Sequence, residues 1–273
     1  MKAILNHNNE DQVAIAFNHQ SAGFDDLYGL NTIIQYKRER VRERLLSYLK
    51  PESHILEINA GTGEDAVFLA KQGHWVHATD ISEGMQDRLT EKVTNAGFSD
   101  KVSFERCSFT VLDRLKNKGP YDCIFSNFAG LNCTNQLGQI LNGFDSLLKP
   151  GALVMMVILP KFCLWETLLF FRGKFKTATR RFFSSRGRMA KIDGFPFRCW
   201  YYSPGFIKRI MKDKYTLLGM EGLCTTVPPS YMENFPEKYP GIYSFLCRTE
   251  KKLCRKWPWN YIGDYYIASF IKK

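Results

Sequence analysis

The fold is decided by residues 55–63, Ile55-Leu-Glu-Ile-Asn-Ala-Gly-Thr-Gly63, and by the apolar run Trp75–Asp80 that follows them. A short apolar run that ends in a glycine-rich turn predicts a buried strand, and the second run predicts its neighbour. A Gly-x-Gly turn between strand and helix lets the backbone approach a ligand, because glycine has no Cβ. Asp80 follows Gly63 by seventeen residues and ends the second run. A carboxylate at that point can accept hydrogen bonds from both hydroxyls of a ribose.

Strands alternate with helical patterns over the first 160 residues. We predict strands at 54–58, 75–80, 102–107, 121–126 and 152–159. Two later apolar segments, 215–227 and 261–271, can supply two more strands. This alternation implies βαβ units and therefore an α/β fold with a seven-stranded, mostly parallel, doubly wound sheet. We expect an insertion after the fifth strand to act as a lid.

Helices are predicted over residues 32–49 and, capped by Ser82, from about residue 83 to 96. A shorter helix is expected within residues 13–30. Residues 37–44, KRERVRER, alternate in charge. We interpret them as the solvated face of their helix rather than as a binding patch.

The composition is that of a folded, soluble protein. Hydrophobic residues make up 45% and charged residues 24%, which is too apolar for a disordered chain. The most apolar stretch, 153–171, is interrupted by Pro160, Lys161 and Glu166, and the N-terminus lacks the apolar core of a signal peptide. We therefore expect a cytoplasmic protein. The eight cysteines form no Cys-x-x-Cys pair and have no histidine at metal-ligand spacing, so we expect free thiols and no metal site.

The two halves of the chain differ in charge. Residues 1–150 hold 16 Lys+Arg and 19 Asp+Glu, a net charge of −3, whereas residues 151–273 hold 22 and 8, a net charge of +14. This contrast suggests that the halves contact different partners.

The residues after the Gly-x-Gly turn argue against a dinucleotide. The dinucleotide fingerprint requires a third glycine, and Ala66 stands in its place. Glu64 and Asp65 at the helix start would repel a pyrophosphate.

Residues 55–85, ILEINAGTGEDAVFLAKQGHWVHATDISEGM, resemble the first two motifs of the class I, Rossmann-like, S-adenosylmethionine-dependent methyltransferases. The segments KVSFERCSF (101–109), YDCIFSNFAGLN (121–132) and LLKPGALVMMVI (147–158) are similar to the third, fourth and fifth motifs, in that order. The likeness covers about residues 13–160.

This resemblance implies methyl transfer from S-adenosylmethionine, with S-adenosylhomocysteine as product. The two carboxylates after the turn are compatible with this cofactor, because it carries a sulfonium cation. The expected organisation is a set of N-terminal cap helices (1–50), a cofactor-binding core (51–160) and a basic, aromatic lid and substrate region that also holds the last strands (161–273). The resemblance says little about the methyl acceptor.

Carried over by position, the resemblance implies cofactor contacts for thirteen residues. These are Phe24 as a closing aromatic, Glu57, Asn59, Ala60, Gly61 and Gly63 in the turn, Asp80 at the ribose, Ile81, Met85, Ser108 and Phe109 near the adenine, and Asn127 and Phe128 beside the transferred methyl.

Three of these residues depart from the family pattern. Asn59 replaces the usual first glycine of the turn, although asparagine tolerates a left-handed backbone. Ala60 replaces a frequent cysteine, and Ser108 replaces an aspartate that binds the adenine amino group. A binding or scaffold protein that keeps the cofactor fold without turnover is therefore the alternative from another class.

Residues 172–191, RGKFKTATRRFFSSRGRMAK, hold eight Lys+Arg and no acid, and apolar residues recur from 164 to 182 at helical spacing. Three interpretations remain open. The segment can be a lid helix with a solvated basic face, a membrane-surface helix that brings the enzyme to the anionic inner face of a membrane, or a nucleic-acid surface. The fourth motif, Asn127-Phe-Ala-Gly, disfavours nucleic acid, because enzymes of this family that methylate base amino groups often carry Asn/Asp-Pro-Pro-Tyr/Phe there.

A small hydrophobic or aromatic molecule, methylated on oxygen, nitrogen or activated carbon, is the acceptor we favour. Methyl transfer is an in-line displacement, so positioning supplies much of the catalysis, and a base is needed only if the acceptor is protonated. The candidate bases are His19, Tyr28 and Tyr202, and the candidate substrate wall consists of Trp165, Arg198, Trp200 and Tyr202, for which packing against the sheet is the alternative.

Overall fold

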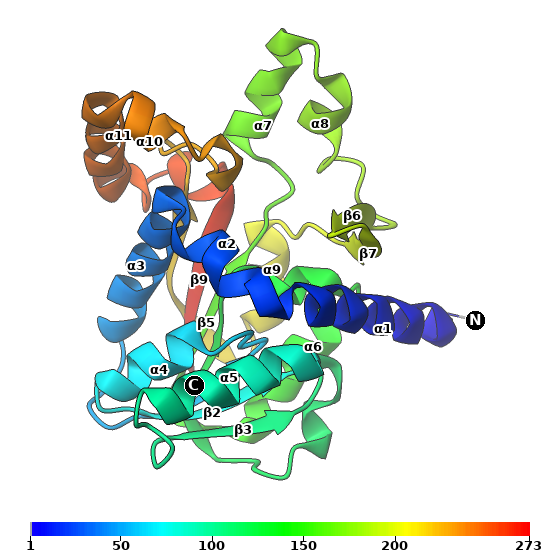
Figure 1. Ribbon diagram of the computed structural model, residues 1–273, viewed down its shortest axis with the longest axis vertical. Coiled ribbons are helices and arrows are strands. Elements are labelled where there is room, and N and C mark those ends of the chain that lie inside the picture. The colour runs from blue at the N-terminus through cyan, green and yellow to red at the C-terminus, as the bar shows by residue number, and fades with distance from the viewer. Residues whose placement is uncertain (1) are drawn as a thin grey trace.

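A computed structural model of the chain describes residues 2–273, with side chains from residue 9 onward. Its centre is a seven-stranded sheet in the order β3-β2-β1-β4-β5-β9-β8 (Figure 1). β9 runs antiparallel to both of its neighbours, and the four other neighbouring pairs are parallel. The strands are β1 (His54–Ile58), β2 (Trp75–Asp80), β3 (Val102–Arg106), β4 (Tyr121–Ser126), β5 (Leu148–Ile158), β8 (Tyr215–Leu223) and β9 (Tyr265–Lys272). The predicted fold class is confirmed.

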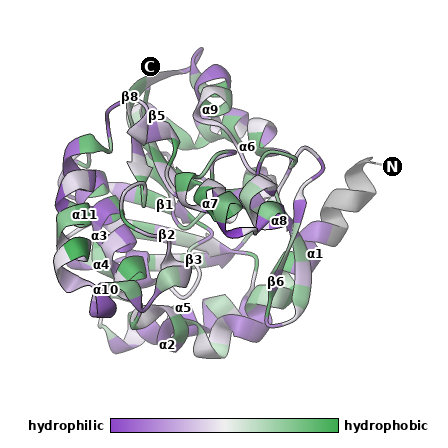
Figure 2. Ribbon diagram, turned by 90° about the horizontal axis from the view of Figure 1, so that it is seen from above, coloured by the Kyte–Doolittle hydropathy of each residue, from purple (hydrophilic) through white to green (hydrophobic). Residues whose placement is uncertain are grey.

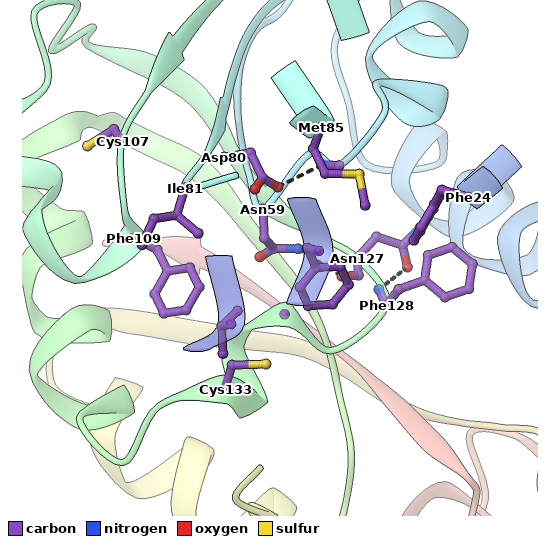
Figure 3. A pocket seen from close by; sticks show the side chains of 14 residues that line it. Phe24, Asn59, Asp80, Ile81, Met85, Cys107, Phe109, Asn127, Phe128 and Cys133 are labelled. Atoms are coloured by element: carbon purple, nitrogen blue, oxygen red, sulfur yellow. Dashed lines mark hydrogen bonds between the residues drawn. The ribbon is translucent and has the colours of Figure 1, made fainter. Parts of the chain in front are cut away.

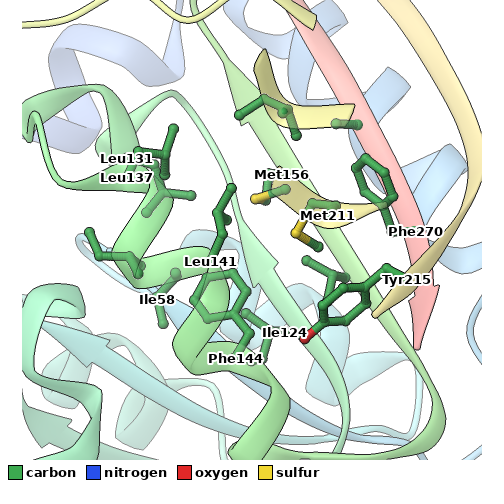
Figure 4. Packing of buried hydrophobic residues seen from close by; sticks show 14 of the residues in the cluster. Ile58, Ile124, Leu131, Leu137, Leu141, Phe144, Met156, Met211, Tyr215 and Phe270 are labelled. Carbon is green, nitrogen blue, oxygen red and sulfur yellow. The ribbon is translucent and has the colours of Figure 1, made fainter. Parts of the chain in front are cut away.

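The two faces of the sheet are covered by different helices. On one face, α6 (Leu137–Gly143) and α9 (Pro204–Met211) enclose a core in which Leu141 and Phe144 pack toward Ile124 and Met156 (Figure 4). The second core is built with α3 (Thr32–Leu46), α4 (Glu64–Lys71) and α5 (Glu83–Asn95). This sandwich fixes the carboxyl ends of the parallel strands, where ligands of open α/β sheets bind.

Two helices precede α3 along the chain, where the sequence predicted one short helix. They are α1 (Lys2–Gln20) and α2 (Phe24–Gly29), joined by a short 3₁₀ turn at Ser21–Gly23. The side chain of Asn31 caps α3 by accepting hydrogen bonds from the backbone of Ile33 and Ile34. α1 contacts α5 and the hairpin strand β7 (Phe195–Cys199), so it crosses the molecule beside the sheet (Figure 1).

The segment between β5 and α9 holds two short helices and a hairpin. They are α7 (Leu164–Leu168), a 3₁₀ turn at Leu169–Arg172, α8 (Phe175–Thr179), and the strands β6 (Arg188–Ile192) and β7. α7 and α8 project from the body of the molecule (Figure 1). Gly173 adopts a φ of 72° and ends the first turn, so the continuous helix suggested by the spacing from 164 to 182 does not form.

Two further helices, α10 (Phe235–Lys238) and α11 (Pro240–Leu253), occupy the chain between β8 and β9. Within residues 2–273 we find no helix that combines the length and apolar character needed to cross a membrane.

Candidate active site

A first pocket lies at the carboxyl ends of β1, β2 and β4 and encloses about 620 Å³ of empty space, its mouth included. Nine of the thirteen residues expected at the cofactor line it: Phe24, Asn59, Gly61, Asp80, Ile81, Met85, Phe109, Asn127 and Phe128. Figure 3 shows Ile81 and Phe109 at one end of this pocket and Phe24 and Phe128 at the other, with Asp80 and Asn59 between them.

The Asp80 carboxylate is fixed by the two loops that meet at the pocket. Its Oδ2 accepts a hydrogen bond of 2.9 Å from the backbone N–H of Gly61, and its Oδ1 accepts one of 2.9 Å from Ser82. Burial raises the pKa of Asp80, although these backbone hydrogen bonds act in the opposite direction. Each oxygen keeps a lone pair, so the carboxylate can accept two more hydrogen bonds from a ligand.

Asn59 joins the turn after β1 to the end of β4. It adopts a φ of 52°, its Nδ2 donates to the carbonyl of Asn127 (3.0 Å), and its Oδ1 accepts from Ser126 Oγ (2.6 Å). The side chain also occupies the space next to Gly130, where an added Cβ would lie 2.7 Å from the Cβ of Asn59. The departure from the family's glycine therefore adds a contact that glycine cannot make.

The loop after β4 is strained and held by a polar network. Phe128 and Ala129 have φ values of 48° and 61°, which costs about 1–3 kcal/mol for each non-glycine residue. Asn127 Nδ2 donates to Asp65 Oδ2 (2.7 Å), and Asp65 Oδ1 accepts from Arg42 Nε (2.6 Å). The network thus ties this side of the pocket to α3.

α1 and α2 cover the first pocket and are hydrogen-bonded to its loops. Asn18 Oδ1 accepts from Ser82 Oγ (2.5 Å) and from the backbone of Gly84 (3.0 Å). Asp25 accepts from Thr62 Oγ1 (2.6 Å), next to the glycine turn. Two apolar residues of α1 line the pocket and were missed by the sequence reasoning, although their spacing of four residues was a signal of a common helix face: Val13 and Phe17.

A second pocket of about 610 Å³ of empty space, its mouth included, adjoins the first. The two pockets share three aromatic side chains, Phe17, Phe24 and Phe128. The remaining lining residues of the second pocket are Tyr28, Ile34, Lys37, Arg38, Ile192, Ser230 and Tyr265. This lining is apolar and aromatic, with two cations and, among the residues that the structure describes, no carboxylate or imidazole.

The interpretation of residues 37–44 as a solvated face is wrong for Lys37 and Arg38. The side chain of Lys37 is 2% exposed and that of Arg38 is 8% exposed. Lys37 is buried because Ser230 and Asp264, far along the chain, provide polar partners, and Arg38 is buried beside Glu64.

Of the candidate bases, Tyr28 lines the second pocket, where its ring packs edge-on against Phe24 (centroids 4.6 Å apart). His19 is exposed, faces Asp193 and Phe195, and lies outside the lining of both pockets. The hydroxyl of Tyr202 donates to the carbonyl of Thr134 inside the core, so this residue is corrected to a packing role.

The expected substrate wall also does not line either pocket. Asn132 exchanges hydrogen bonds with the backbone of Trp200, which draws this segment onto the sheet and buries Trp200 and Tyr202 in the core. Arg198 is exposed and donates to the carbonyl of Arg186 (3.2 Å), and Trp165 lies on α7. Packing, the alternative to a substrate wall, fits Trp200 and Tyr202 better.

Four expected cofactor residues lie beside the first pocket rather than in its lining. Gly63 ends the turn with a φ of 79°, where an added Cβ would collide with Leu89. Ser108 caps the turn after β3 by accepting from the backbone of Thr110 (3.2 Å). Glu57 is buried behind the turn, and burial, with the nearby Asp65, raises its pKa well above the usual value. The fourth is Ala60.

One buried group of potential metal ligands is filled by a guanidinium. Cys163, Glu166 and Asp264 have ligand atoms within 4.8 Å of one another. Arg181 Nη2 donates to Glu166 Oε1 (2.6 Å) and Asp264 Oδ1 (2.7 Å), and Arg180 Nε donates to Glu166 Oε2 (2.8 Å), so two guanidinium charges already face these two carboxylates.

Residues 55–151 match the family model described as a methyltransferase domain. Together with the sheet order and the pocket at the ends of β1 and β2, this match supports a class I S-adenosylmethionine-dependent methyltransferase with S-adenosylmethionine as its cofactor.

Two curated relatives are similar over part of the chain. A demethylmenaquinone methyltransferase of Bacteroides fragilis is 31% identical over 146 residues, which is 52% of this chain and 57% of that protein. A tRNA 5-carboxymethoxyuridine methyltransferase of Escherichia coli is 28% identical over 117 residues, which is 42% of this chain and 44% of that protein. The chain thus spans about half the length of the curated relatives it matches.

Solved structures share the fold at low identity. A putative S-adenosylmethionine-dependent methyltransferase from Listeria monocytogenes aligns with a TM-score of 0.59 at 15% identity, over 88% of this chain and 99% of that one. The 1,6-didemethyltoxoflavin-N1-methyltransferase of Burkholderia thailandensis, solved with 1,6-didemethyltoxoflavin and S-adenosylhomocysteine, aligns with a TM-score of 0.59 at 13% identity, over 98% and 90%.

Proposed function

We propose that this protein transfers the methyl group of S-adenosylmethionine, bound in the first pocket, to a small acceptor bound in the second. The observation that carries the proposal is that the two pockets adjoin at Phe17, Phe24 and Phe128. A methyl group presented at that end of the first pocket is within reach of an acceptor in the second.

The residues of the first pocket fit the cofactor. Asp80 would hold the ribose hydroxyls, Ile81 and Phe109 would pack against the adenine, and the turn at Gly61 would accommodate the methionine part. When bound, S-adenosylmethionine supplies an electrophilic methyl group on a sulfonium centre. Glu64 and Asp65 form the first turn of α4, where two carboxylates would repel a pyrophosphate. A cofactor with a sulfonium cation is compatible with this helix start.

Positioning and water exclusion are the catalytic contributions we assign to the protein. α1 and α2 cover the site, and the shared aromatic rings of Phe24 and Phe128 separate the reacting centre from solvent. Because the described lining of the second pocket holds no carboxylate or imidazole, we expect an acceptor whose nucleophile needs no general base, and Tyr28 is the candidate base in this lining for an acceptor that is protonated.

An apolar and aromatic second pocket supports a small hydrophobic or aromatic acceptor. RNA is the alternative acceptor, because one curated relative is a tRNA methyltransferase. A protein that binds the cofactor without catalysis is the alternative to an enzyme. A mobility shift with tight, salt-sensitive RNA binding would favour RNA. Comparison of metabolites with and without the gene would identify the acceptor without a guess at its structure.

Calorimetry with S-adenosylmethionine and S-adenosylhomocysteine tests the cofactor part of the proposal. We expect Asp80→Ala to weaken both affinities by about 10- to 100-fold, because hydrogen bonds to a charged group contribute about 1.5–3 kcal/mol. Asp87→Ala removes an exposed carboxylate of α5 and should leave both affinities unchanged. Equal affinities of the wild type and Asp80→Ala would contradict the ribose assignment.

We also propose that the projecting segment 164–191 contacts an anionic membrane surface. Five phenylalanines of this segment are 47–83% exposed: Phe170, Phe171, Phe175, Phe182 and Phe183. The segment 172–191 holds eight cations and no acid. Arg181 is buried against Glu166 and Asp264, and Arg180 pairs with Glu166, so the other six cations complement an anionic lipid surface. Figure 2 shows hydrophilic and hydrophobic residues together on α7 and α8. Flotation with phosphatidylglycerol vesicles should retain the protein, and the double variant Phe171→Ser, Phe183→Ser should lose this retention. Equal retention of the protein on anionic and neutral vesicles would contradict this proposal.

A further inference from the structure

We propose that the acceptor carries an anionic group, a carboxylate or a phosphate, which Lys37 and Arg38 bind inside the second pocket. This inference rests on the proposed function, because it specifies the substrate class of the same site. Carboxylates and phosphates present the same oxygen acceptors to cationic side chains.

Lys37 is a buried ammonium with unused hydrogen-bonding capacity. Its Nζ donates to Ser230 Oγ (3.1 Å) and lies 4.5 Å from the centroid of the Tyr265 ring. The nearest carboxylate oxygen, on Asp264, is 3.8 Å away, beyond hydrogen-bond distance. An ammonium has three donors, and two of those of Lys37, which lines the second pocket, make no hydrogen bond to the described residues.

The partner of Lys37 is itself committed elsewhere. Asp264 accepts a 2.7 Å hydrogen bond from Arg181, which is buried with it. Burial lowers the pKa of Lys37, but the neighbouring Tyr265 and Asp264 raise it by more, so the side chain stays cationic. The positive charge of Lys37 is therefore only partly balanced by the protein.

Arg38 adds a second cation in the same lining. Its Nε is buried and has no hydrogen-bond partner among the described residues, and its guanidinium lies 5.1 Å from the centroid of Phe128. One Nη is 3.3 Å from Glu64 Oε2, but the Glu64 carboxylate also contacts Lys92 (2.7 Å) and Arg42 (3.8 Å). Arg42 and Lys92 have further carboxylate partners, Asp65 and Asp25, whereas Arg38 has only its share of Glu64 and keeps an unpaired Nε among the described residues.

Burial of adjacent cations is unfavourable unless something compensates for the lost solvation. A bound anion would complete the hydrogen bonding of both side chains. Phe17, Ile34 and Ile192 line the same pocket and would contact the uncharged part of the ligand. The ligand class is therefore an anionic group on an apolar or aromatic body.

Three naphthalene probes of similar shape test this inference on the protein saturated with S-adenosylhomocysteine. They are 2-naphthoate, 2-naphthyl phosphate and the neutral 2-naphthamide, and their binding is followed by their fluorescence. We expect at least one anion to bind about tenfold more tightly than the amide, and the better anion identifies the preferred group.

Variants of Lys37 and Arg38 test the two cations, and their unchanged binding of neutral ligands shows that they remain folded. Lys37→Met and Arg38→Gln should each reduce anion affinity about tenfold while the affinities for 2-naphthamide and S-adenosylhomocysteine stay unchanged, and Arg38→Lys should retain part of the preference. Arg44→Gln removes a cation of the same helix that pairs with Glu221 outside the pocket, and it should change none of these values.

Equal binding of the amide and both anions, or no anion binding up to the solubility limit, would overturn the inference. So would an anion preference that survives in Lys37→Met and Arg38→Gln. Failure of the wild type to bind S-adenosylhomocysteine would instead overturn the proposed function, so the two failures are distinguishable.

Discussion

At the scale of single residues, Asn59 shows how a departure from a family motif is accommodated. The sequence predicted only that asparagine tolerates a left-handed backbone, and the φ of 52° agrees. Its hydrogen bonds to Ser126 and Asn127 could not be predicted, because those residues are 67 and 68 positions away along the chain. Gly130 is the matching small residue across this contact, since any larger side chain would collide with Asn59.

The contact between Asn59 and Gly130 predicts that mutations at these two positions change the free energy of unfolding non-additively. We expect Gly130→Ala to lower the free energy of unfolding by about 1–3 kcal/mol through overpacking and to weaken S-adenosylhomocysteine binding. The added cost should shrink in the Asn59→Gly background, where the clash is absent, and a double-mutant cycle on denaturation curves measures this coupling. Gly143→Ala is the control, because an added Cβ there meets nothing within 4 Å. Additive effects of Asn59→Gly and Gly130→Ala would refute the contact.

The raised pKa of Asp80 predicts how cofactor affinity depends on pH. Only the ionised carboxylate can accept from both ribose hydroxyls, so binding should strengthen as the pH rises through the pKa of the free protein. Because burial raises this pKa, the midpoint should lie above the ordinary aspartate value of about 3.9. Calorimetry with S-adenosylhomocysteine at decreasing pH measures it, and Asp80→Asn should abolish this dependence. An equally steep profile in Asp80→Asn would assign the titration to another group.

At the scale of elements, the sequence predicted β1, β2 and β4 to the residue, because each is bounded by clear turn residues. β5 begins at Leu148, four residues before the predicted start at 152, because Pro150-Gly151 lies within the strand. The two N-terminal helices were not separated, and α7 and α8 were merged. These errors occur where apolar spacing is the only signal and a single glycine decides the outcome.

The helix α1 is the element for which we predict a dynamic role. Asn18→Ala removes the hydrogen bonds that join α1 to Ser82 and Gly84, so the cover over the first pocket should open more readily. We expect release of S-adenosylhomocysteine to become several-fold faster in stopped-flow measurements, with little change in the melting temperature. Asp11→Ala, an exposed substitution on the same helix, should leave the rate unchanged. An unaltered rate in Asn18→Ala would mean that α1 does not gate the pocket.

At the scale of the whole molecule, the site combines parts that the sequence pattern cannot place together. The first pocket was largely predictable, because its residues follow consecutive strands and meet at one edge of the sheet. The second pocket was not, because it joins α1, α2 and α3 to Ile192, Ser230 and Tyr265. Burial of Lys37 likewise depends on Ser230 and Asp264, both more than 190 residues away, so local charge alternation gave the wrong interpretation.

The central claim is that the pocket at the end of β1 and β2 holds S-adenosylmethionine by its ribose. The most direct measurement is a crystal structure grown with saturating S-adenosylhomocysteine. We predict ribose hydroxyls hydrogen-bonded to Asp80, the adenine between Ile81 and Phe109, and the sulfur facing the aromatic rings shared with the second pocket. A pocket without density at saturation, or a ligand whose ribose lies away from Asp80, would contradict the account.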